Sequence, residues 1–310
     1  MSTPTDVPAT SVTSPILDTS TEAGKMRAEN RRRALGKKYS FLEDLASRPV
    51  FAEENGRSPL PSFVCITDDS SSPDAASSAY VLVFQGIRDG IGTSTVASAV
   101  AWQLAQRKSA RVAALCTAES ALGFRHLFNL PEAGADPQTG AFWRYGDHLL
   151  LRVPALEESA TLETLRLQID ALSKKGVTHI VVDAGPARSP EAALWCSAAD
   201  VFTTVLTADV NTILRAADHE VEPREVLLFN RVHPFSESDA DAASFLRAMP
   251  RLMPYWAPKA VPHDEFAARA AFRRGPVTQL SPYAESAQTL AAFATWVTLR
   301  AERLRREATC

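Results

Sequence analysis

The feature that most constrains this chain is a glycine-containing loop between a buried strand and a helix. Residues 80–95 read YVLVFQGIRDGIGTST, and Val96, Val100 and Leu104 follow at helical spacing. Such a loop directs free backbone N–H groups and the positive end of a helix dipole to one point. An anion such as a phosphate can bind there, although many loops of this kind are only tight strand-to-helix turns.

Short β-branched segments alternate with helical segments over most of the chain. This alternation predicts an α/β fold with a mostly parallel central sheet flanked by helices, in one domain over residues 79–310. Residues 284–306 are predicted to form a long helix that packs on the core through Leu290, Phe293, Trp296 and Val297. The predicted strands are 80–84, 111–115, 148–153, 177–182, 201–206 and 225–229.

Residues 1–78 have a different composition. The first 24 residues are rich in Ser, Thr and Pro and contain no aromatic residue, Lys or Arg, while residues 25–38 are basic. We expect residues 1–78 to form an N-terminal arm that is largely disordered, because it cannot bury enough apolar surface to fold alone. Residues 26–52 could form a short helix that binds a partner, and the basic segment could contact acidic lipid or simply be solvated.

Composition excludes several classes of protein. The chain of 310 residues has 33 Lys and Arg against 36 Asp and Glu, a net charge of −3, so it lacks the positive field of a general nucleic-acid binder. No run of apolar residues is long enough for a membrane span, and the N-terminus does not resemble a signal peptide. The 4 cysteines are scattered, which fits a reducing cytoplasm. The six histidines form no metal-binding spacing.

The loop resembles the deviant Walker A motif of the MinD/ParA group of P-loop ATPases, K-G-G-x-G-K-[ST]-[ST]. Arg88 stands where the group has its first Lys, and Thr93 stands where it has the second. Further segments match in order: THIVVD at 178–183, LLFNR at 227–231 and VPHD at 261–264. The strings FQGIRDGIGTSTVASAVAWQL and VLTADVN are similar to the MinD-like accessory proteins of bacterial cellulose secretion, and this similarity covers roughly residues 80–300.

The resemblance implies that the chain binds ATP and Mg²⁺. In this family Ser94 and Asp183 would hold the metal, Asn230 would contact adenine, and Arg88 would reach the phosphates of the second subunit in a homodimer. The nucleotide-binding residues that the resemblance implies are Arg88, Gly90, Ile91, Gly92, Thr93, Ser94, Thr95, Asp183, Asn230 and Pro262.

Three departures from the motif weaken the expected chemistry. Thr93 brings no charge, whereas a charge pair near 4 Å is worth about 4 kcal/mol at a surface-like effective dielectric. Asp89 places a carboxylate beside the expected triphosphate unless it only stabilises a turn. Residues 114–119 read ALCTAE, so Cys116 and Ala118 replace the acidic residues that orient the attacking water. We therefore assign no catalytic residue and expect little or no hydrolysis.

The resemblance implies an accessory or regulatory protein of bacterial cellulose synthesis and secretion. We expect a cytoplasmic homodimer that associates with other cellulose-secretion subunits at the inner membrane, is peripheral there through these partners, and acts through association instead of turnover. Two alternatives remain open. One is a ParA-type or MinD-type partitioning or polar-localisation ATPase, and the other is a nucleotide-free pseudo-ATPase scaffold.

Overall fold

The structure is a computed structural model that describes residues 62–65, 78–117, 120–130, 141–146, 148–152, 161–233 and 235–309. All of these residues belong to one compact unit, Gly56–Cys310. The predicted helix at 26–52 and the basic segment before it lie outside the described residues. Ala118, which stands where the family has an acidic residue, and its neighbour Glu119 also lie outside them.

The centre of the unit is a sheet in which eight strands are described, in the order β1-β4-β5-β3-β6-β2-β7-β8. From β5 to β8 all neighbouring strands run parallel, while β4 is antiparallel to both β5 and β1. The mostly parallel α/β fold predicted from the sequence is therefore confirmed. The strands are β1 (Ser62–Cys65), β2 (Tyr80–Gly86), β3 (Val112–Cys116), β4 (Ala141–Tyr145), β5 (Leu149–Arg152), β6 (His179–Pro186), β7 (Val201–Leu206) and β8 (Glu225–Phe229).

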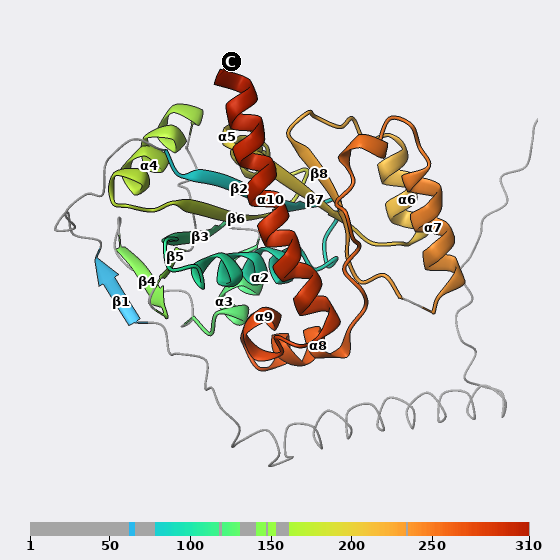
Figure 1. Cartoon of the computed structure of the whole chain (residues 1–310), viewed down its shortest axis with the longest axis horizontal. Coiled ribbons are helices and arrows are strands. Elements are labelled where there is room, and N and C mark those ends of the chain that lie inside the picture. Colours follow the sequence, from blue (N-terminus) through green and yellow to red (C-terminus); the bar gives the residue numbers. More distant parts are fainter. Residues whose placement is uncertain are drawn as a thin grey trace, which may run out of the picture. The chain divides into compact units, whose positions relative to one another are not determined.

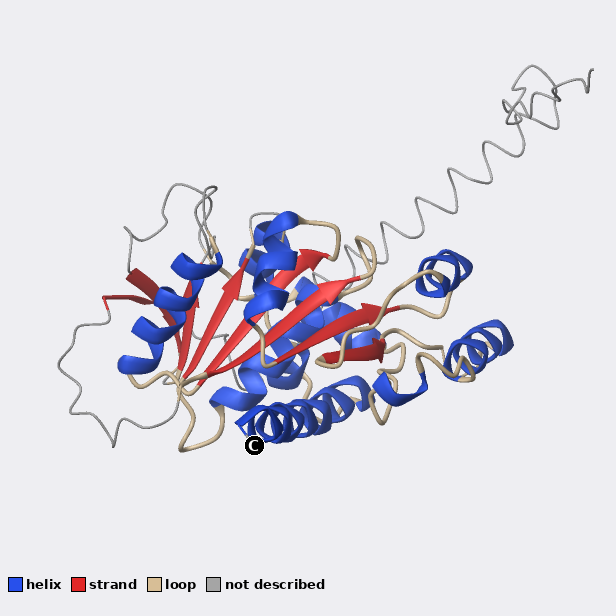
Figure 2. Ribbon diagram, turned by 90° about the horizontal axis from the view of Figure 1, so that it is seen from above, coloured by secondary structure: helices blue, strands red, loops and turns tan. Residues whose placement is uncertain are grey.

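Helices cover both faces of the sheet (Figures 1 and 2). One hydrophobic core joins the sheet to α2, α10 and the helices near them, and a second core joins its other face to α4 and α5. The described helices are α2 (Thr93–Ala105), α3 (Ala121–Leu127), α4 (Leu162–Lys174), α5 (Pro190–Ala198), α6 (Val210–Ala217), α7 (Glu237–Arg247), α8 (Glu265–Phe272), α9 (Val277–Leu280) and α10 (Glu285–Thr309), with a 3₁₀ turn at Met253–Tyr255.

Strand β2 lies between β6 and β7 and is buried on both faces. Its near-continuous apolar sequence is typical of an interior parallel strand covered by two helical layers. The chain leaves β2 through α2 toward β3 on one side, whereas the strand on its other side, β7, comes later in the chain. The carboxyl end of β2 is therefore a point where the strand order reverses, which is where open α/β sheets place their ligand sites.

Two strands were not predicted from the sequence. Strand β4 reads AFWRY, and both Phe142 and Trp143 are buried, so it lacks the apolar–polar alternation that marks a strand. Strand β1 lies in the range assigned to the arm and pairs with β4, with Ser62 opposite Arg144. The domain boundary between residues 78 and 79 stays a prediction.

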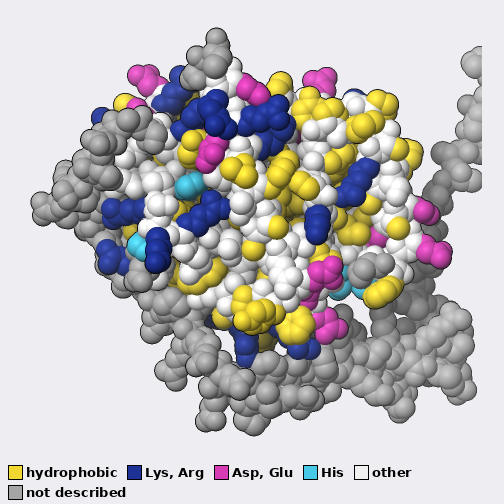
Figure 3. Space-filling model, in the orientation of Figure 1, with side chains coloured by type: hydrophobic (Ala, Val, Ile, Leu, Met, Phe, Trp, Pro, Cys, Tyr) yellow, Lys and Arg dark blue, Asp and Glu magenta, His cyan; other side chains and the backbone are white. Residues whose placement is uncertain are grey.

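Helix α10 packs along the first core. Leu290, Phe293 and Val297 are buried and Trp296 is partly buried, as the sequence analysis predicted. Basic side chains gather near its C-terminal end (Figure 3), where they complement the helix dipole. Within the described residues, none of the helices combines the length and the apolar character that a membrane span requires.

Candidate functional site

The loop between β2 and α2 forms one wall of a cavity of about 250 Å³. The other walls come from the carboxyl-end segments after β3, β6 and β8, so four strands contribute to one site. The lining residues are Arg88, Asp89, Gly90, Gly92, Thr93, Ser94, Ser120, Gly123, Gly185, Pro186 and Arg231.

Helix α2 begins at this cavity without a side-chain cap. Among the described residues, no side chain at its N-cap position accepts a hydrogen bond from the first turn, because that position is Gly92. By contrast, Ser189 caps α5 and Asp209 caps α6 through their side chains. The first N–H groups of a helix need an acceptor, so an anion in the cavity would supply what no side chain supplies here.

Gly92 cannot be replaced without disturbing the loop. Its φ of +91° lies in the left-handed region, and a Cβ atom there would stand 2.5 Å from Nδ2 of Asn230. A glycine therefore permits both the turn into α2 and the close approach of the segment after β8. The side chains of Asn230 and Arg231 therefore occupy the space next to the Cα atom of Gly92.

Asp183 is completely buried behind the cavity wall, in contact with the lining residues Ser94 and Gly185. Its Oδ2 atom has no hydrogen-bond partner within the described part of the chain, while Gly185 N–H donates to Oδ1 at 3.4 Å. Burial raises the pKa of this carboxyl to about 6, although the Ser94 hydroxyl, the Gly185 N–H and the Ser120 hydroxyl act in the opposite direction. An unsatisfied carboxylate oxygen beside a serine hydroxyl is a donor set that suits Mg²⁺.

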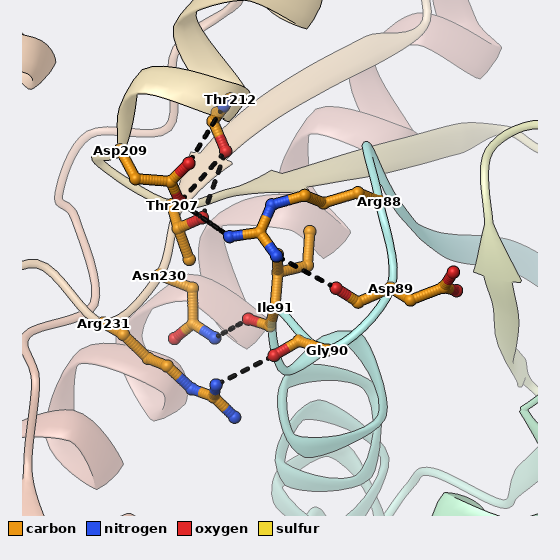
Figure 4. Close-up of polar contacts among 9 residues, drawn as sticks. All are labelled: Arg88, Asp89, Gly90, Ile91, Thr207, Asp209, Thr212, Asn230 and Arg231. Carbon is orange, nitrogen blue, oxygen red and sulfur yellow. Dashed lines mark hydrogen bonds and ion pairs between the residues drawn. The ribbon is translucent and has the colours of Figure 1, made fainter. Parts of the chain in front are cut away.

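The segment after β8 holds the loop from one side (Figure 4). The Asn230 side chain donates from Nδ2 to the carbonyl oxygen of Ile91 at 2.8 Å, and Arg231 donates from a guanidinium N–H to the carbonyl oxygen of Gly90 at 2.9 Å. Asn230 is 5% exposed and its backbone N–H bonds to Leu206. Asn230 thus fixes the loop, and its predicted contact with adenine stays a prediction.

Arg88, a residue of the loop, connects the loop to the segment after β7 (Figure 4). Its guanidinium forms an ion pair with Asp209 at 2.7 Å and donates to the Thr207 hydroxyl at 3.3 Å and to the Asp89 carbonyl at 3.2 Å. Asp209 is the N-cap residue of α6, so Arg88 ties the loop to the segment after β7. The hydrogen bonds of Thr207 and Arg88 hold the pKa of the Asp209 carboxyl below its usual value against the effect of burial.

The structure brings most of the predicted site residues together. Arg88, Gly90, Gly92, Thr93 and Ser94 line the cavity. Asp183 lies beneath them, and Ile91 and Asn230 support the loop from behind; Thr95 continues into the first turn of α2. Pro262 does not line the cavity and instead lies beside Val232, to which it is bridged.

Sequence reasoning missed several residues of the site. Arg231 follows Asn230 directly in the quoted segment LLFNR, but no rule of the motif assigns it a role. Asp209 lies in the quoted string VLTADVN, but the string assigns it no role, and Ser120 lies in no quoted motif; the parallel order of β3, β6, β2 and β7 brings their segments to the loop. A polar residue at the end of every neighbouring strand is the one sign that could have been used.

The strand order, the loop and the buried acid together define a P-loop protein of the MinD/ParA type, and comparison with solved structures agrees. A ParA family ATPase from Chlorobium tepidum TLS superimposes with a TM-score of 0.52 and 18% identity over 71% of this chain and 99% of its own. The MinC:MinD cell division complex of Aquifex aeolicus superimposes with a TM-score of 0.58 and 16% identity, over 71% of this chain and 96% of its own. The ATP complex of an McdA variant from Cyanothece superimposes with a TM-score of 0.57 and 16% identity, over 73% of this chain and 97% of its own. At these identities the likeness establishes the fold.

The particular family is given by a family model. The model described as "Cellulose biosynthesis protein BcsQ" matches residues 153–298. Together with the MinD/ParA fold, this match over residues 153–298 confirms the resemblance drawn from the sequence. No curated protein matches the chain. Within the described residues, no group of three or more His, Cys, Asp or Glu side chains could hold a metal ion by itself.

Proposed function

We propose that the chain is a MinD-like accessory protein of bacterial cellulose synthesis and secretion that binds ATP with Mg²⁺ at its altered P-loop. It acts as a cytoplasmic homodimer that associates with cellulose-secretion subunits at the inner membrane, with little or no hydrolysis. The family match over residues 153–298 supports the cellulose part of this proposal. The ATP complex of the McdA variant, a protein of the same fold, supports the choice of nucleotide.

One observation carries the nucleotide proposal: the cavity joins an uncapped helix start to a buried carboxylate with an unpartnered oxygen atom. The backbone from Gly90 to Ser94 would hold the phosphates, and Ser94 and Asp183 would hold the metal. Bound Mg²⁺ would neutralise part of the phosphate charge. Arg88, Ile91, Thr95, Asn230 and Pro262 complete the proposed site, with Asn230 and Pro262 on the adenine side.

The low turnover follows from what surrounds the cavity. Among the described lining residues the one carboxylate is that of Asp89, which is exposed and points away from Arg88 and Arg231 (Figure 4). The segment after β3 offers Thr117 and Ser120, whose hydroxyls bond to each other and, from Ser120, to the Asp183 carbonyl, and neither is a base. None of these described residues would therefore act as a general base toward a water molecule in the cavity.

The proposal is tested by thermal unfolding and by mass in solution. The purified chain with ATP and Mg²⁺ should melt at a higher temperature than without them and should shift toward the dimer mass, because a ligand that binds only the folded state stabilises it. Phosphate release should stay near background. Ser94→Ala should lose the Mg²⁺-dependent part of the shift, whereas Ser197→Ala, on the distant helix α5, should keep it.

Other outcomes point to other functions. An unchanged melting temperature and mass with excess ATP would favour a nucleotide-free scaffold. Steady phosphate release, with salt-sensitive binding to nonspecific DNA, would favour a partitioning ATPase instead. Purification of cellulose-secretion subunits with the tagged full chain tests the partner proposal separately from the nucleotide proposal.

A further inference from the structure

The cavity lacks the lysine that normally neutralises a bound triphosphate, but it does not lack positive charge. Thr93 occupies the place of that lysine and contributes only a hydroxyl. Two guanidinium groups, those of Arg88 and Arg231, line the same cavity. Only a cation that is not already neutralised inside the protein can take over the role of the lysine, so the two arginines must be compared.

Arg88 is already paired. Its guanidinium forms the 2.7 Å ion pair with Asp209, donates to Thr207 and Asp89, and thereby ties the loop to the start of α6. Removing it from Asp209 would leave that carboxylate without its cation. Arg88 is therefore held by the fold in the present conformation.

Arg231 is placed differently. Its one hydrogen bond within the described part of the chain goes to the carbonyl oxygen of Gly90, a neutral group, at 2.9 Å. No described carboxylate forms an ion pair with it, although burial and the nearby charge of Arg88 both lower its pKa. An exposed guanidinium on the cavity wall, beside a second cation and without a described counter-ion, is a group that an anion can bind through charge-assisted hydrogen bonds.

The backbone keeps Arg231 in this position. Its φ of +58° lies in the left-handed region, which is unfavourable for a side chain of this size. Asn230 is fixed by Ile91 and Leu206, and Val232 is fixed by the Val261 carbonyl, so the residue between them cannot move far. This backbone directs the Arg231 side chain toward the carbonyl oxygen of Gly90 (Figure 4). Atoms of the same side chain lie 3.2 and 3.3 Å from the position that a Cβ atom on Gly92 would take.

The opposite wall points to a ligand independently. The fully buried Asp183 contacts Ser94, and its Oδ2 atom has no described hydrogen-bond partner. The negative charge of Asp183 would stabilise a metal ion that is bound together with a phosphate. We propose that Arg231 is the phosphate-binding cation of this site and replaces, from the end of β8, the charge that Thr93 does not supply from the loop. This proposal rests on the proposed binding of ATP.

The test compares nucleotide affinities by titration calorimetry with the full chain. Arg231→Gln should raise the Kd for ATP and Mg²⁺ by about tenfold or more, as expected for loss of a hydrogen bond to a charged group. The same substitution should weaken the binding of ADP less, and the binding of adenosine hardly at all. Arg231→Lys should recover part of the affinity. Arg166→Gln, the same change on the exposed face of α4, should bind like the wild type.

A second variant separates charge from structure. If Arg231 acts by its charge, Thr93→Lys in the Arg231→Gln background should restore ATP affinity, because it returns a cation to the loop. A purely structural role through the Gly90 hydrogen bond would lower the melting temperature of the free protein and would not be rescued. Equal ATP affinity of wild type and Arg231→Gln would overturn this inference alone, whereas a wild type that does not bind ATP would overturn the proposed function.

Discussion

At the scale of single residues, Asp183 is held in an unfavourable electrostatic state. It is completely buried, its Oδ2 atom lacks a described partner, and burial raises its pKa from 3.8 to about 6. At neutral pH the folded chain therefore keeps a charge that the unfolded chain carries at lower cost in water. A residue that destabilises the fold in this way is typical of a binding site that a cation completes.

Asp183→Asn should accordingly stabilise the protein when no divalent cation is present. The gain at neutral pH is at most about 3 kcal/mol, because each pKa unit corresponds to about 1.4 kcal/mol. The same variant should lose the stabilisation that Mg²⁺ adds in the presence of ATP. Urea unfolding with EDTA and with Mg²⁺–ATP measures both effects. Asp209→Asn is the control of opposite sign, because its carboxylate is stabilised by Arg88 and its removal should lower stability.

A second buried acid, Glu225, is satisfied by its neighbours. It is 1% exposed and accepts hydrogen bonds from the Thr204 hydroxyl, from His219 Nε2 at 2.7 Å and from the Glu222 backbone N–H at 3.3 Å. The hydrogen bond and charge of Glu225 raise the pKa of His219 above 6.5; Glu222 adds to this effect, while burial and Arg251 oppose it.

This pair predicts a pH dependence of stability. Because folding raises the pKa of His219, its contribution is fully present below about pH 6.5 and is lost as the pH rises through the higher folded value. His219→Gln should therefore cost roughly 1–3 kcal/mol near pH 6 and clearly less near pH 9. Denaturant unfolding of both proteins at the two pH values measures this. An equal difference at both would show that His219 is not charged in the folded state.

The residues of the site divide by how far the sequence could predict them. The loop residues, Ser94 and Asp183 follow from short motifs whose geometry is local, and the structure brings them to one cavity. Arg231 could not be assigned, because its role depends on a positive φ and on the end of a strand more than a hundred residues away. Asp209 is set by the same tertiary geometry.

At the scale of elements, the loop before α2 depends on two glycines with positive φ, Gly90 at +75° and Gly92 at +91°. They differ in their surroundings. A Cβ atom on Gly92 would collide with Asn230, whereas a Cβ atom on Gly90 would meet no described atom within 4 Å. Substitutions at the two glycines therefore separate the effect of backbone strain from that of steric collision.

Gly90→Ala should cost about 1 kcal/mol from strain alone and should still bind ATP. Gly92→Ala should cost more, because it also displaces the Asn230 side chain that holds the Ile91 carbonyl, and it should lose the ATP-dependent rise in melting temperature. Differential scanning calorimetry with and without ATP measures both quantities. Identical behaviour of the two variants would mean that Asn230 does not support the loop.

Near its C-terminal end, helix α10 is connected to the start of β2 through Arg305. Arg305 donates to both carboxylate oxygens of Asp200, at 2.9 and 2.5 Å, and to the carbonyl oxygens of Ser78 and Ala79. Its guanidinium also lies 4.1 Å from the ring centroid of Tyr80. These contacts connect the last helix to the start of β2, the strand that leads into the loop.

Arg305→Gln should therefore lower the free energy of unfolding by roughly 1–3 kcal/mol, as expected for a partly buried, hydrogen-bonded cation. Arg303→Gln on the same helix is the matched control. Arg303 pairs with Glu307 one turn away at the surface, so its removal should change stability little. Urea unfolding measures both variants, and equal effects would indicate that the Asp200 contact does not stabilise the helix.

The elements themselves were mostly readable from the sequence. Strands such as β2, β7 and β8 are short buried segments rich in apolar and β-branched residues, and α4 and α10 have one apolar face, so period and length identify them. Strand β4 was missed because it has only five residues, of which Phe142, Trp143 and Tyr145 are buried while Arg144 is exposed, so apolar and polar residues do not alternate. Its antiparallel pairing with β5 could not be inferred from any local pattern.

At the scale of the whole molecule, the position of Arg88 bears on assembly. In the described structure its guanidinium forms an ion pair with Asp209 of the same chain. If Arg88 instead contacts the phosphates of a second subunit in the proposed dimer, it must first leave Asp209. The internal ion pair would then compete with dimerisation.

Two substitutions should consequently have opposite effects on the dimer. Arg88→Ala should reduce the fraction of dimer formed with ATP and Mg²⁺, because the contact across the interface is lost. Asp209→Asn should increase it, because Arg88 is released. Sedimentation velocity over a range of protein concentrations measures both fractions. A decrease in both variants would show that Arg88 acts by ordering its own loop and not across an interface.

The residues that hold the loop from the side of Asn230 and Arg231 follow β8, which is the last strand in the order of the sheet. Beyond it lies the segment with Trp256, whose ring stacks on Phe229 at 4.5 Å. The edge of the sheet, together with the segment after β7, thus holds the loop in place. A partner that displaced β8 would therefore change the proposed nucleotide site without contacting the nucleotide.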